Sequence, residues 1–239
     1  MIPTLFKYHK TNEFLFEILI NKTLYCADIN ELNDPHDGIY LFSDTLKKSI
    51  AGNTINIVRQ NIAFQNATLN NSVEDETIMN ASLSKINEKE FFDLLQQAGA
   101  NLNVCSFTET SDNELMWAHY ADNFKGVCLE FDFSEVQSIS NVLSKVTYSN
   151  NIPTINSVNL DEIKKAMTMK RIAWTNEREW RMLTPEKKIK FEPKHLKSIT
   201  FGPRTPRSFE NMINQICHSM NLSHVTLQKI HVDLNGIKF

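Results

Sequence analysis

Alternation of apolar and polar positions is the clearest pattern in the second half of the chain. Val127, Leu129 and Phe131 alternate with Cys128 and Glu130, which is the period of a strand with one buried face. Similar patterns nearby predict a series of strands that pair with one another. The strands predicted in this half span residues 103–108, 126–133, 177–183, 188–191, 197–201 and 225–234.

Apolar residues at helical spacing predict helices between and before these strands. Thr11 is expected to cap a helix that runs to about residue 20. Ser111 or Asp112 is expected to cap a short helix over residues 113–123. Longer helices are predicted at residues 160–172, where the pattern is amphipathic, and at 209–220.

The N-terminal half combines short strands, a turn and a long helical stretch. Residues 5–8 and 23–27 are expected to be strands. The run from Asn33 to Gly38 contains Asn-Asp-Pro and Asp-Gly, which are strong turn signals, and it offers too few ligands at defined spacing for a metal loop. From residue 43 to about 99, helical spacing around a polar middle predicts a helical insertion.

This order of elements favours an α+β fold over a regular βαβ alternation. Strands adjacent in sequence form one group, and the helices lie elsewhere along the chain. We therefore expect a single α+β domain over residues 1–239, with the helical insertion at about 43–99. Its sheet is expected to be mostly antiparallel, either continuous or split, with helices packed around it.

The composition excludes a strong bulk attraction to nucleic acid. The 239 residues are 41% hydrophobic and 22% charged, which is ordinary for a globular protein, and the net charge is -3. One basic stretch remains open to two interpretations, a solvated surface or a local face for phosphates. It contains Lys187, Lys188, Lys190, Lys194, Lys197, Arg204 and Arg207.

The cysteines favour a reducing compartment. Cys26, Cys105, Cys128 and Cys217 form no CxxC pair, and a zinc site needs closer spacing. Cys105 and Cys128 lie in apolar strands, where reduced cysteine acts as a small hydrophobe. The first residues do not resemble a signal peptide, and no run of 18 apolar residues predicts a membrane span. We expect a cytoplasmic protein with no membrane partner.

The segment 174–181 is the first candidate for chemistry. On a strand, side chains alternate faces, so Glu177, Glu179 and Arg181 are expected to share one side while Trp180 faces a core. Two like charges so placed resist joint ionisation unless a cation offsets them. The arrangement suits a site that stabilises positive charge on a substrate. The alternative is a solvated strand face with a weak surface ion pair.

The segment 106–126 is the second candidate. Ser106 and Thr108 share one face of a predicted strand, where small hydroxyls can line a ligand cleft. The next helix carries an aromatic patch that is open to two interpretations, a core or a ligand platform. The patch is Trp117, Tyr120 and Ala121 at positions i, i+3 and i+4, with His119 pointing elsewhere.

Several of these motifs together resemble a large bacterial family of unknown function. The match covers most of the chain apart from the insertion, and its most specific part is the run of MWaHYad and kGvcleFd motifs. The matching residues are Leu5 to Tyr8, Asn33 to Pro35, Ser106 to Asp132, Lys170, Trp174, Glu177, Glu179, Trp180, Arg181, and Ile199 to Gly202. This resemblance implies a family but no activity.

The chain also resembles, more loosely, the ADP-ribosyltransferase superfamily. This resemblance lies in the order of three features along the chain: an N-terminal strand, a strand with small hydroxyl side chains, and a late Glu-x-Glu motif. It implies an NAD-dependent enzyme that cleaves the nicotinamide glycosidic bond and transfers ADP-ribose to an acceptor, with no metal. Glu179 would stabilise the oxocarbenium-like transition state, and Glu177 would orient or activate the acceptor. The implied cofactor-binding residues are Lys7, Tyr8, Ser106, Thr108, Trp117, His119, Tyr120 and Arg181.

Three other function classes stay open. One is an interaction protein, which gains support only if the helical insertion presents an exposed apolar patch. A non-catalytic regulatory module that binds a nucleotide or small ligand predicts that cations neutralise Glu177 and Glu179, which then point away from any pocket. A nucleic-acid enzyme of phage defence or of a toxin–antitoxin system would hold Mg²⁺ with Asp34, Asp37 and Glu177 and bind phosphates with the basic stretch. No motif identifies the acceptor, which is a protein, a nucleic acid, a small molecule or water, and none defines the oligomeric state.

Overall fold

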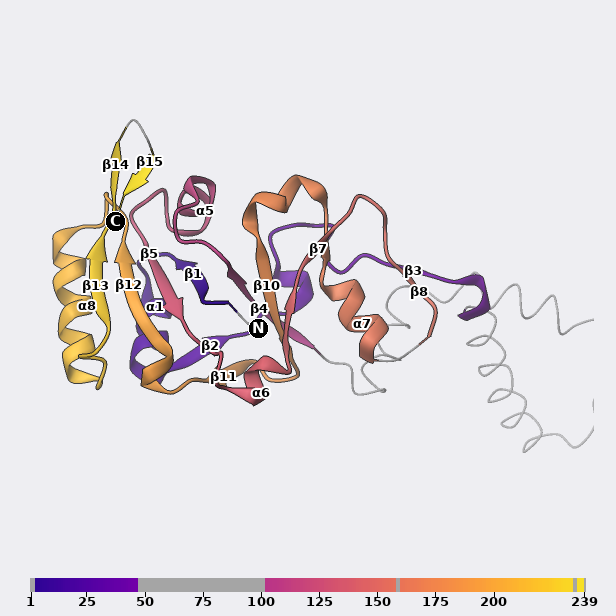
Figure 1. Ribbon diagram of the computed structural model, residues 1–239, viewed down its shortest axis with the longest axis horizontal. Helices are drawn as coiled ribbons and strands as arrows, with labels where there is room; N and C mark the ends of the chain where they lie inside the picture. Colours follow the sequence, from indigo (N-terminus) through magenta and orange to yellow (C-terminus); the bar gives the residue numbers. More distant parts are fainter. Residues whose placement is uncertain (1–2, 47–101, 158–159, 234–235, 239) are drawn as a thin grey trace, which may run out of the picture. The chain divides into compact units, whose positions relative to one another are not determined.

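The computed structural model describes residues 3–46, 102–157, 160–233 and 236–238 (Figure 1). Nearly all of the predicted helical insertion at 43–99 lies outside these described residues. The chain divides into two compact units. The first is Met1–Asp37, Leu102–Asn150 and Thr168–Phe239, and the second is Gly38–Asn101 and Asn151–Met167. The single domain expected over the whole chain stays a prediction.

Seven strands of the first unit form one mostly antiparallel sheet, so the predicted α+β class is confirmed (Figure 1). The strand order is β13-β12-β5-β1-β4-β10-β6, and only the β12–β13 pair in this sheet is parallel. The strands are β1 Leu5–His9, β4 Asn103–Thr108, β5 Val127–Phe131, β6 Leu143–Lys145, β10 Glu179–Thr184, β12 Leu196–Phe201 and β13 Thr226–Lys229.

This sheet is split between β1 and β4. β1 pairs with β5 along its full length, and β4 pairs with β10 along its full length. Between β1 and β4, however, the register holds a single pair, Phe6 with Thr108. Further along β4, an isolated bridge joins Val104 to Ala27. The edge of β4 is therefore open between these two bridges, and the sheet consists of two halves joined at one point.

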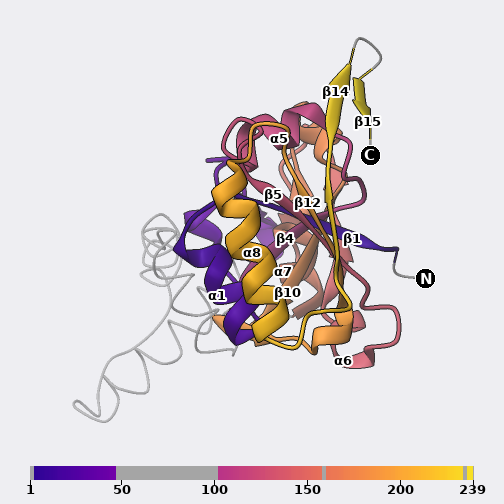
Figure 2. The same cartoon turned by 90° about the vertical axis from the view of Figure 1, so that its left-hand side faces the viewer.

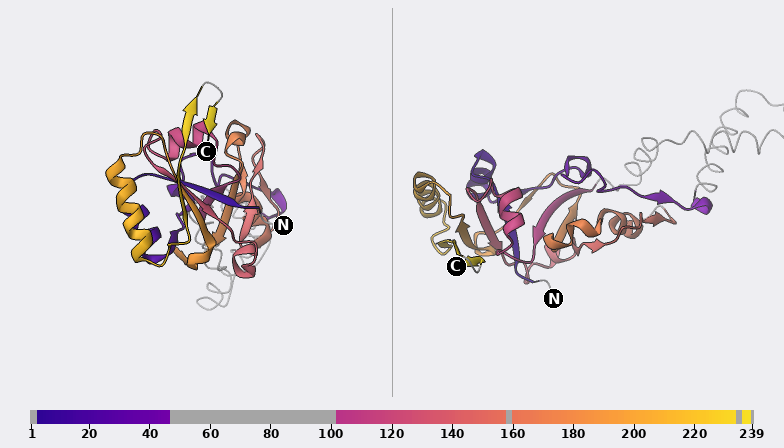
Figure 3. Two further views of the ribbon diagram at one scale, coloured as in Figure 1. Left: turned by 60° about the vertical axis from the view of Figure 1, so that its left-hand side comes forward. Right: turned by 90° about the horizontal axis from the view of Figure 1, so that it is seen from above.

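Among the described residues, the other strands form short pairs. In the first unit, β2 Thr23–Tyr25 pairs with β11 Lys188–Lys190, and β7 Thr147–Tyr148 pairs with β9 Met169–Lys170. The hairpin of β14 His231–Asp233 and β15 Gly236–Lys238 projects beyond the end of β13 (Figures 1 and 3). In the second unit, β3 Leu41–Phe42 pairs with β8 Thr154–Ile155, beside helix α7 Leu160–Met167.

Two helices cover one face of the main sheet. Helices α1 Glu13–Asn21 and α8 Arg207–Ser219 lie side by side (Figure 2), with the ring centroids of Phe16 and Phe209 5.4 Å apart. The predicted helix at 209–220 is thus confirmed to within two residues. Burial of the apolar face of each helix drives this packing. The core that these helices form with the sheet includes Leu15, Leu19, Leu129, Phe131, Phe133, Ile199, Phe201 and Ile213.

Helix α5 Glu114–Tyr120 packs on the other face, where Trp117 forms the centre of a second core cluster with Tyr8 and Cys128. The Trp117 and Tyr8 rings meet edge to face at 5.1 Å. The remaining helices in the described part of the first unit are short and lie at the ends of strands. They are α6 Gln137–Ser140 and the 3₁₀ helices η1 Ile29–Glu31, η2 Ile172–Glu177 and η3 Pro193–His195.

Three helix boundaries differ from the sequence predictions. Asn12, not Thr11, caps α1, because its side-chain oxygen accepts from the Leu15 amide. Asn113, not Ser111 or Asp112, caps α5 by accepting from two backbone amides of the first turn. The helix predicted at 160–172 ends at Met167, because Met169 and Lys170 leave the helix to pair with β7.

Candidate functional site

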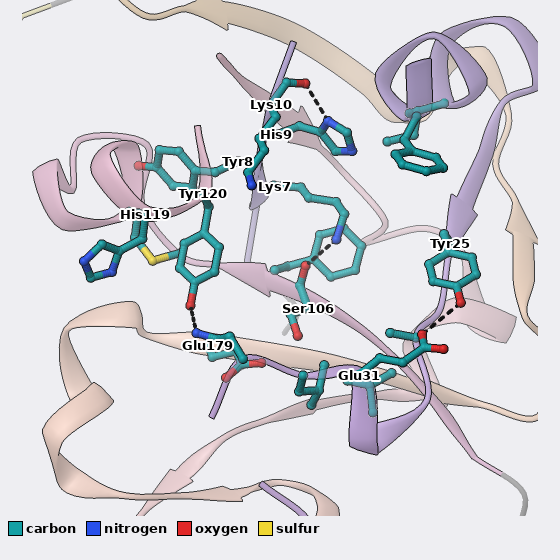
Figure 4. Close-up of a pocket in the computed structure, with 18 of the residues that line it drawn as sticks. Lys7, Tyr8, His9, Lys10, Tyr25, Glu31, Ser106, His119, Tyr120 and Glu179 are labelled. Atoms are coloured by element: carbon teal, nitrogen blue, oxygen red, sulfur yellow. Dashed lines mark hydrogen bonds between the residues drawn. The ribbon is translucent and has the colours of Figure 1, made fainter. Parts of the chain in front are cut away.

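A cavity of about 890 Å³ lies in the first unit where the sheet is split. Consecutive residues of β1 (Phe6, Lys7 and Tyr8) line it, as do Ser106 and Phe107 of β4. Since neighbouring residues of a strand point to opposite faces, this lining indicates a cavity between the strands rather than on one face of the sheet. At the open edge of β4, the Lys7 amino group donates to the Ser106 carbonyl oxygen at 3.0 Å (Figure 4).

Five charged residues with buried side chains meet beside one end of this cavity. We call them the ion cluster: Asp37, Lys170, Glu177, Glu179 and Arg181. Lys170 Nζ lies 2.5 Å from Glu177 Oε2 and 3.0 Å from Glu179 Oε2. The Lys170 ammonium also lies 5.0 Å from the ring centroid of Trp174. Lys170 therefore bridges the two glutamates that the sequence singled out.

Arg181 extends the ion cluster away from the cavity. Its Nε donates to Glu179 Oε1 at 2.8 Å, and its Nη2 donates to Asp37 Oδ1 at 2.9 Å. The residue is 0% exposed, compared with 3% for Glu177 and 4% for Glu179. A solvated strand face with a surface ion pair is thereby ruled out for these positions.

The charges of the ion cluster do not balance, since three carboxylates face two cations. Burial disfavours ionisation of Glu179, but Arg181 and Lys170 outweigh it and lower the pKa of this carboxyl to about 2. Burial raises the pKa of Asp37 above its ordinary value despite Arg181. Asp37 Oδ2 is buried without a hydrogen-bond partner and lies 4.0 Å from Lys170 Nζ. Glu179 is thus the firmly ionised member, and Asp37 carries the unbalanced charge.

Tyr120 connects the ion cluster to the turn at Asn33. Its hydroxyl donates to Glu177 Oε1 at 2.6 Å and accepts from Asn33 Nδ2 at 2.7 Å. Burial and the hydrogen bond to Glu177 raise the pKa of this phenol, so it stays protonated. The turn predicted from the Asn-Asp-Pro motif is present, and its Asn33 orients an aromatic ring of the cavity wall.

Glu177 does not lie on the strand where the alternation placed it. It ends η2, and β10 begins only at Glu179. Between them, Arg178 adopts a left-handed conformation with φ of 45°, which turns the backbone. The Thr108 hydroxyl fixes this turn by donating to the Glu177 carbonyl oxygen at 2.7 Å. The two glutamates converge through this turn and through Lys170, and not through strand alternation.

The predicted cofactor-binding residues divide into two groups. Five of them line the cavity: Lys7, Tyr8, Ser106, His119 and Tyr120.

Thr108, Trp117 and Arg181 do not line it, so the structure does not support direct contact of these three with a ligand there. Trp117 is a core residue whose indole nitrogen donates to the Ser111 carbonyl oxygen at 2.8 Å. Arg181 donates to the Glu179 carboxylate, and the Thr108 hydroxyl donates to the Glu177 carbonyl oxygen.

The cavity has a second aromatic end that the sequence did not reveal. Phe14 is 58% exposed and Tyr25 is 48% exposed, and both line the cavity. The Tyr25 hydroxyl donates to Glu31 Oε2 at 2.9 Å. In Figure 4, Lys7 and Ser106 lie between this end and the end formed by Tyr120 and Glu179. The cavity therefore has an aromatic group at each end and a lysine between them.

Several lysines of the basic stretch pair with exposed carboxylates. Lys188 meets Glu17 at 3.2 Å, and Lys194 meets Glu192 at 3.0 Å. These pairs support the interpretation of a solvated surface for this part of the stretch. Lys188 differs from the other basic residues of the stretch because it also lines the cavity. It lies opposite Tyr25 in the register of β2 and β11.

No three His, Cys, Asp or Glu side chains are placed to hold a metal ion within residues 3–46, 102–157, 160–233 and 236–238. The side chains expected to hold Mg²⁺ in a nucleic-acid enzyme have other contacts. Asp37 contacts Arg181, Glu177 contacts Lys170 and Tyr120, and Asp34 accepts from the His36 backbone amide at 2.9 Å.

The chain matches a known protein family over part of its length. The family "Protein of unknown function (DUF2971)" matches residues 116–182, a segment that contains Tyr120, Lys170, Glu177, Glu179 and Arg181. The predicted resemblance to a family of unknown function is thereby confirmed, and the resemblance to ADP-ribosyltransferases stays a prediction. No curated protein and no solved structure matches the chain. Among the described residues, no helix has the length and apolar character needed to cross a membrane.

Proposed function

We propose that this protein is an ADP-ribosyltransferase-like enzyme that cleaves the nicotinamide glycosidic bond of NAD⁺ and transfers ADP-ribose to an acceptor. One observation carries the proposal: Glu179, buried and held ionised, lines a cavity at the split of a mostly antiparallel sheet. The proposed enzyme acts in the cytoplasm. Roles in phage defence or in a toxin–antitoxin system are predictions that only the cellular context can test.

The chemistry requires a fixed negative charge. When the bond between the ribose C1′ and nicotinamide breaks, its electron pair leaves with nicotinamide and the ribose becomes oxocarbenium-like. An ionised carboxylate below the ribose stabilises that positive charge, as in glycosidases. Glu179 meets the requirement because its pKa of about 2 keeps it charged at neutral pH. A preorganised contact of this kind contributes roughly 3–4 kcal/mol to transition-state stabilisation.

The two aromatic ends of the cavity suit the two bases of a dinucleotide. Tyr120 and His119 would contact nicotinamide beside Glu179, and Phe14 and Tyr25 would stack on the adenine at the other end. Lys7 lies between the two ends, where the pyrophosphate of such a ligand would need a cation. The cavity volume of about 890 Å³ is within the usual range for sites that enclose ligands of this size.

Glu177 has a positioning role in this proposal. Its carboxylate accepts from Tyr120 and from Lys170, and both of these partners line the cavity. It therefore orients these two side chains in the cavity wall and contributes through them. An acceptor would meet the Tyr120 hydroxyl before it met the Glu177 carboxylate.

The test is release of nicotinamide from NAD⁺, followed by proton NMR with the purified full-length chain. We expect Glu179→Gln to lower the rate by 10²-fold or more, on the order of the loss found when one transition-state contact is removed. Glu192→Gln is the matched control, because Glu192 is exposed and lies outside the cavity lining. Circular dichroism establishes that both variants fold. If the wild type releases no nicotinamide while NAD⁺ resonances are unchanged by the protein, the proposal is wrong.

A second candidate is a nucleotide-binding module without transfer activity. This alternative predicts that cations neutralise the two glutamates. Lys170 and Arg181 both form ion pairs with Glu179, as it requires. It also predicts glutamates that point away from any pocket, whereas both Glu177 and Glu179 line the cavity. NAD⁺ that binds but keeps its nicotinamide, with a comparable affinity in Glu179→Gln, would favour the module.

A further inference from the structure

Two of the buried cysteines face each other across the edge of β4. Ala27 and Val104 exchange both backbone hydrogen bonds, at 2.8 and 2.7 Å, and so form a hydrogen-bonded antiparallel pair. The next residues in this register are Cys26 and Cys105, which occupy the non-hydrogen-bonded position. There, Cα atoms of directly opposed residues are about 4.5 Å apart, and the side chains lie closest. A disulfide needs Cα atoms about 4.4–6.8 Å apart.

The surroundings of this pair differ from those of the other cysteines. The thiols of Cys26 and Cys105 belong to the same core cluster, and each influences the pKa of the other. The influence of Cys26, together with the charge of Lys7, outweighs burial and lowers the pKa of Cys105. Burial instead raises the pKa of Cys128 and of Cys217. Since the thiolate is the reactive form, we expect Cys105 to react before Cys26 within this pair.

We propose that Cys26 and Cys105 are a redox modification site that a hydroperoxide converts to an intramolecular disulfide. The Cys105 thiolate attacks one peroxide oxygen, which breaks the O–O bond and gives a sulfenic acid, with water formed after proton uptake. The Cys26 sulfur then attacks the sulfenic sulfur, loses its proton and releases a second water. In total, two thiols lose two electrons and two protons, and one hydrogen peroxide becomes two waters. Thiol reductants reverse the reaction, as expected for a transient disulfide in a reducing compartment.

The position of the pair ties this modification to the cavity. Ala27, Val104 and Ser106 flank the two cysteines in sequence and line the cavity. Lys7 donates to the Ser106 carbonyl oxygen, and its charge lowers the pKa of Cys105. A disulfide removes the thiolate that Lys7 faces and fixes residue 26 to β4. We therefore expect the affinity of the cavity for an anionic ligand to change on oxidation, whether or not the protein cleaves NAD⁺.

The test uses the full-length protein under native conditions. Hydrogen peroxide is added, free thiols are alkylated after denaturation, and the intact mass and proteolytic peptides are analysed. We expect two of the four thiols to escape alkylation, a mass loss of two hydrogens, and a linked peptide pair with Cys26 and Cys105, all reversed by dithiothreitol. Cys217→Ser is the matched control and should still form the link, whereas Cys26→Ser should give sulfenic acid at Cys105. Equal alkylation of all four thiols, or links only between molecules, would overturn the proposal.

A second measurement tests the role of Lys7 as a positioning residue. Removal of a neighbouring cation disfavours the thiolate, so Lys7→Met should slow oxidation about 10-fold at neutral pH and move the midpoint of the rate-against-pH profile upward. Lys10→Met is the control, because Lys10 is a second lysine of the cavity wall that lies beyond the end of β1. An unchanged midpoint in Lys7→Met would contradict the proposed activation of Cys105.

Discussion

Lys170 offsets the electrostatic repulsion between the buried carboxylates of Glu177 and Glu179. Its ammonium lies within 3.0 Å of both carboxylates, and its own side chain is 2% exposed. Burial disfavours its charge, yet Glu179 and Glu177 outweigh that effect and raise its pKa. Without this ammonium, two buried carboxylates would face each other, with Arg181 beside Glu179 and Tyr120 beside Glu177. The stability of the site therefore depends on a residue outside the Glu-x-Glu motif.

We predict that Lys170→Met destabilises the protein by roughly 3–5 kcal/mol, the usual effect of removing one partner from a buried ion pair. The matched control is Lys188→Met, which removes an exposed pair with Glu17 and should change the free energy of unfolding by less than about 1 kcal/mol. Urea denaturation measures both variants. Equal losses in the two variants would show that the ion cluster is not stabilised by Lys170.

Stability should also depend on pH through Glu179. Its folded-state pKa of about 2 lies below the ordinary 4.5, so its ionised form is favoured by folding. The contribution, roughly 3 kcal/mol, is fully present above pH 4.5 and is lost as the pH falls towards 2. Asp37 acts in the opposite direction, because burial raises its pKa and its protonation relieves the unbalanced charge.

The measurement is the free energy of unfolding between pH 5 and pH 2, for the wild type and for Glu179→Gln. We expect a steep loss in the wild type and a clearly shallower slope in the variant. A variant with the wild-type slope would assign the acid sensitivity to other carboxyls, such as Asp132, whose pKa is lowered by Ser134.

Gly126 fixes the junction between α5, β1 and β5. A Cβ at this position would lie 2.2 Å from the His9 carbonyl oxygen and 2.8 Å from the Ala121 Cα, both backbone atoms. The preceding residues Asp122, Asn123 and Phe124 all have positive φ, so the chain turns sharply from the helix into the strand. The glycine of the family motif is thus required by close packing of three elements, with its amide donating to Ala121 at 2.7 Å.

Gly126→Ala should therefore cost roughly 2–4 kcal/mol of stability, because β1 or the turn must move. Gln215→Ala on the exposed face of α8 is the control and should change stability by less than about 0.5 kcal/mol. Thermal unfolding with both variants tests this. A stable Gly126→Ala variant would mean that β1 is free to shift, contrary to its full pairing with β5.

Local sequence patterns predicted which helices and strands form better than they predicted the residues at which these elements begin and end. Strand β4 matches the predicted 103–108, and the predicted 126–133 contains β5, because alternation directly records which side of a strand is buried. The helix predicted at 160–172 ends at Met167, since tertiary contacts override a helical pattern once Lys170 reaches Glu177 and Glu179. Caps shifted by one or two residues because several adjacent polar side chains are equally able to cap.

The sequence predicted the part of the site that depends on a local pattern and missed the contacts made between separate elements. Glu179 and Arg181 are two apart on one strand, so alternation correctly placed them on one face. Lys170 and Asp37 reach them from other elements, and no local pattern encodes such contacts. The aromatic end at Phe14 and Tyr25 was missed because it is formed by two elements that face a cavity rather than a core.

At the scale of the whole first unit, the split of the sheet is the feature that creates a binding site. Two half-sheets joined by the single pair Phe6 and Thr108 leave backbone groups at the edge of β4 that a continuous sheet would satisfy. Lys7 satisfies one of them, the Ser106 carbonyl oxygen. A ligand that fills the cavity should hold the two halves together and stabilise the fold by mass action, by about 2.7 kcal/mol at 100 times its Kd.

This linkage gives a prediction that separates binding from catalysis. ADP-ribose lacks nicotinamide, so its affinity tests the aromatic end at Tyr25 independently of Glu179. Tyr25→Ala should weaken ADP-ribose binding roughly 10-fold, since stacking of a base on an aromatic ring contributes about 1–3 kcal/mol. Tyr25→Phe keeps the ring and should keep most of the affinity, although it loses the hydrogen bond to Glu31.

Thermal shift and calorimetric titration measure these affinities, with ribose 5-phosphate as the control ligand because it carries no base. If Tyr25→Ala weakens ADP-ribose and leaves ribose 5-phosphate unchanged, the far end of the cavity binds a base. If both ligands weaken alike, Tyr25 supports the fold of β2 and β11 rather than contacting a base. If neither weakens, the base does not reach Tyr25, and the dinucleotide orientation proposed for the split sheet is wrong.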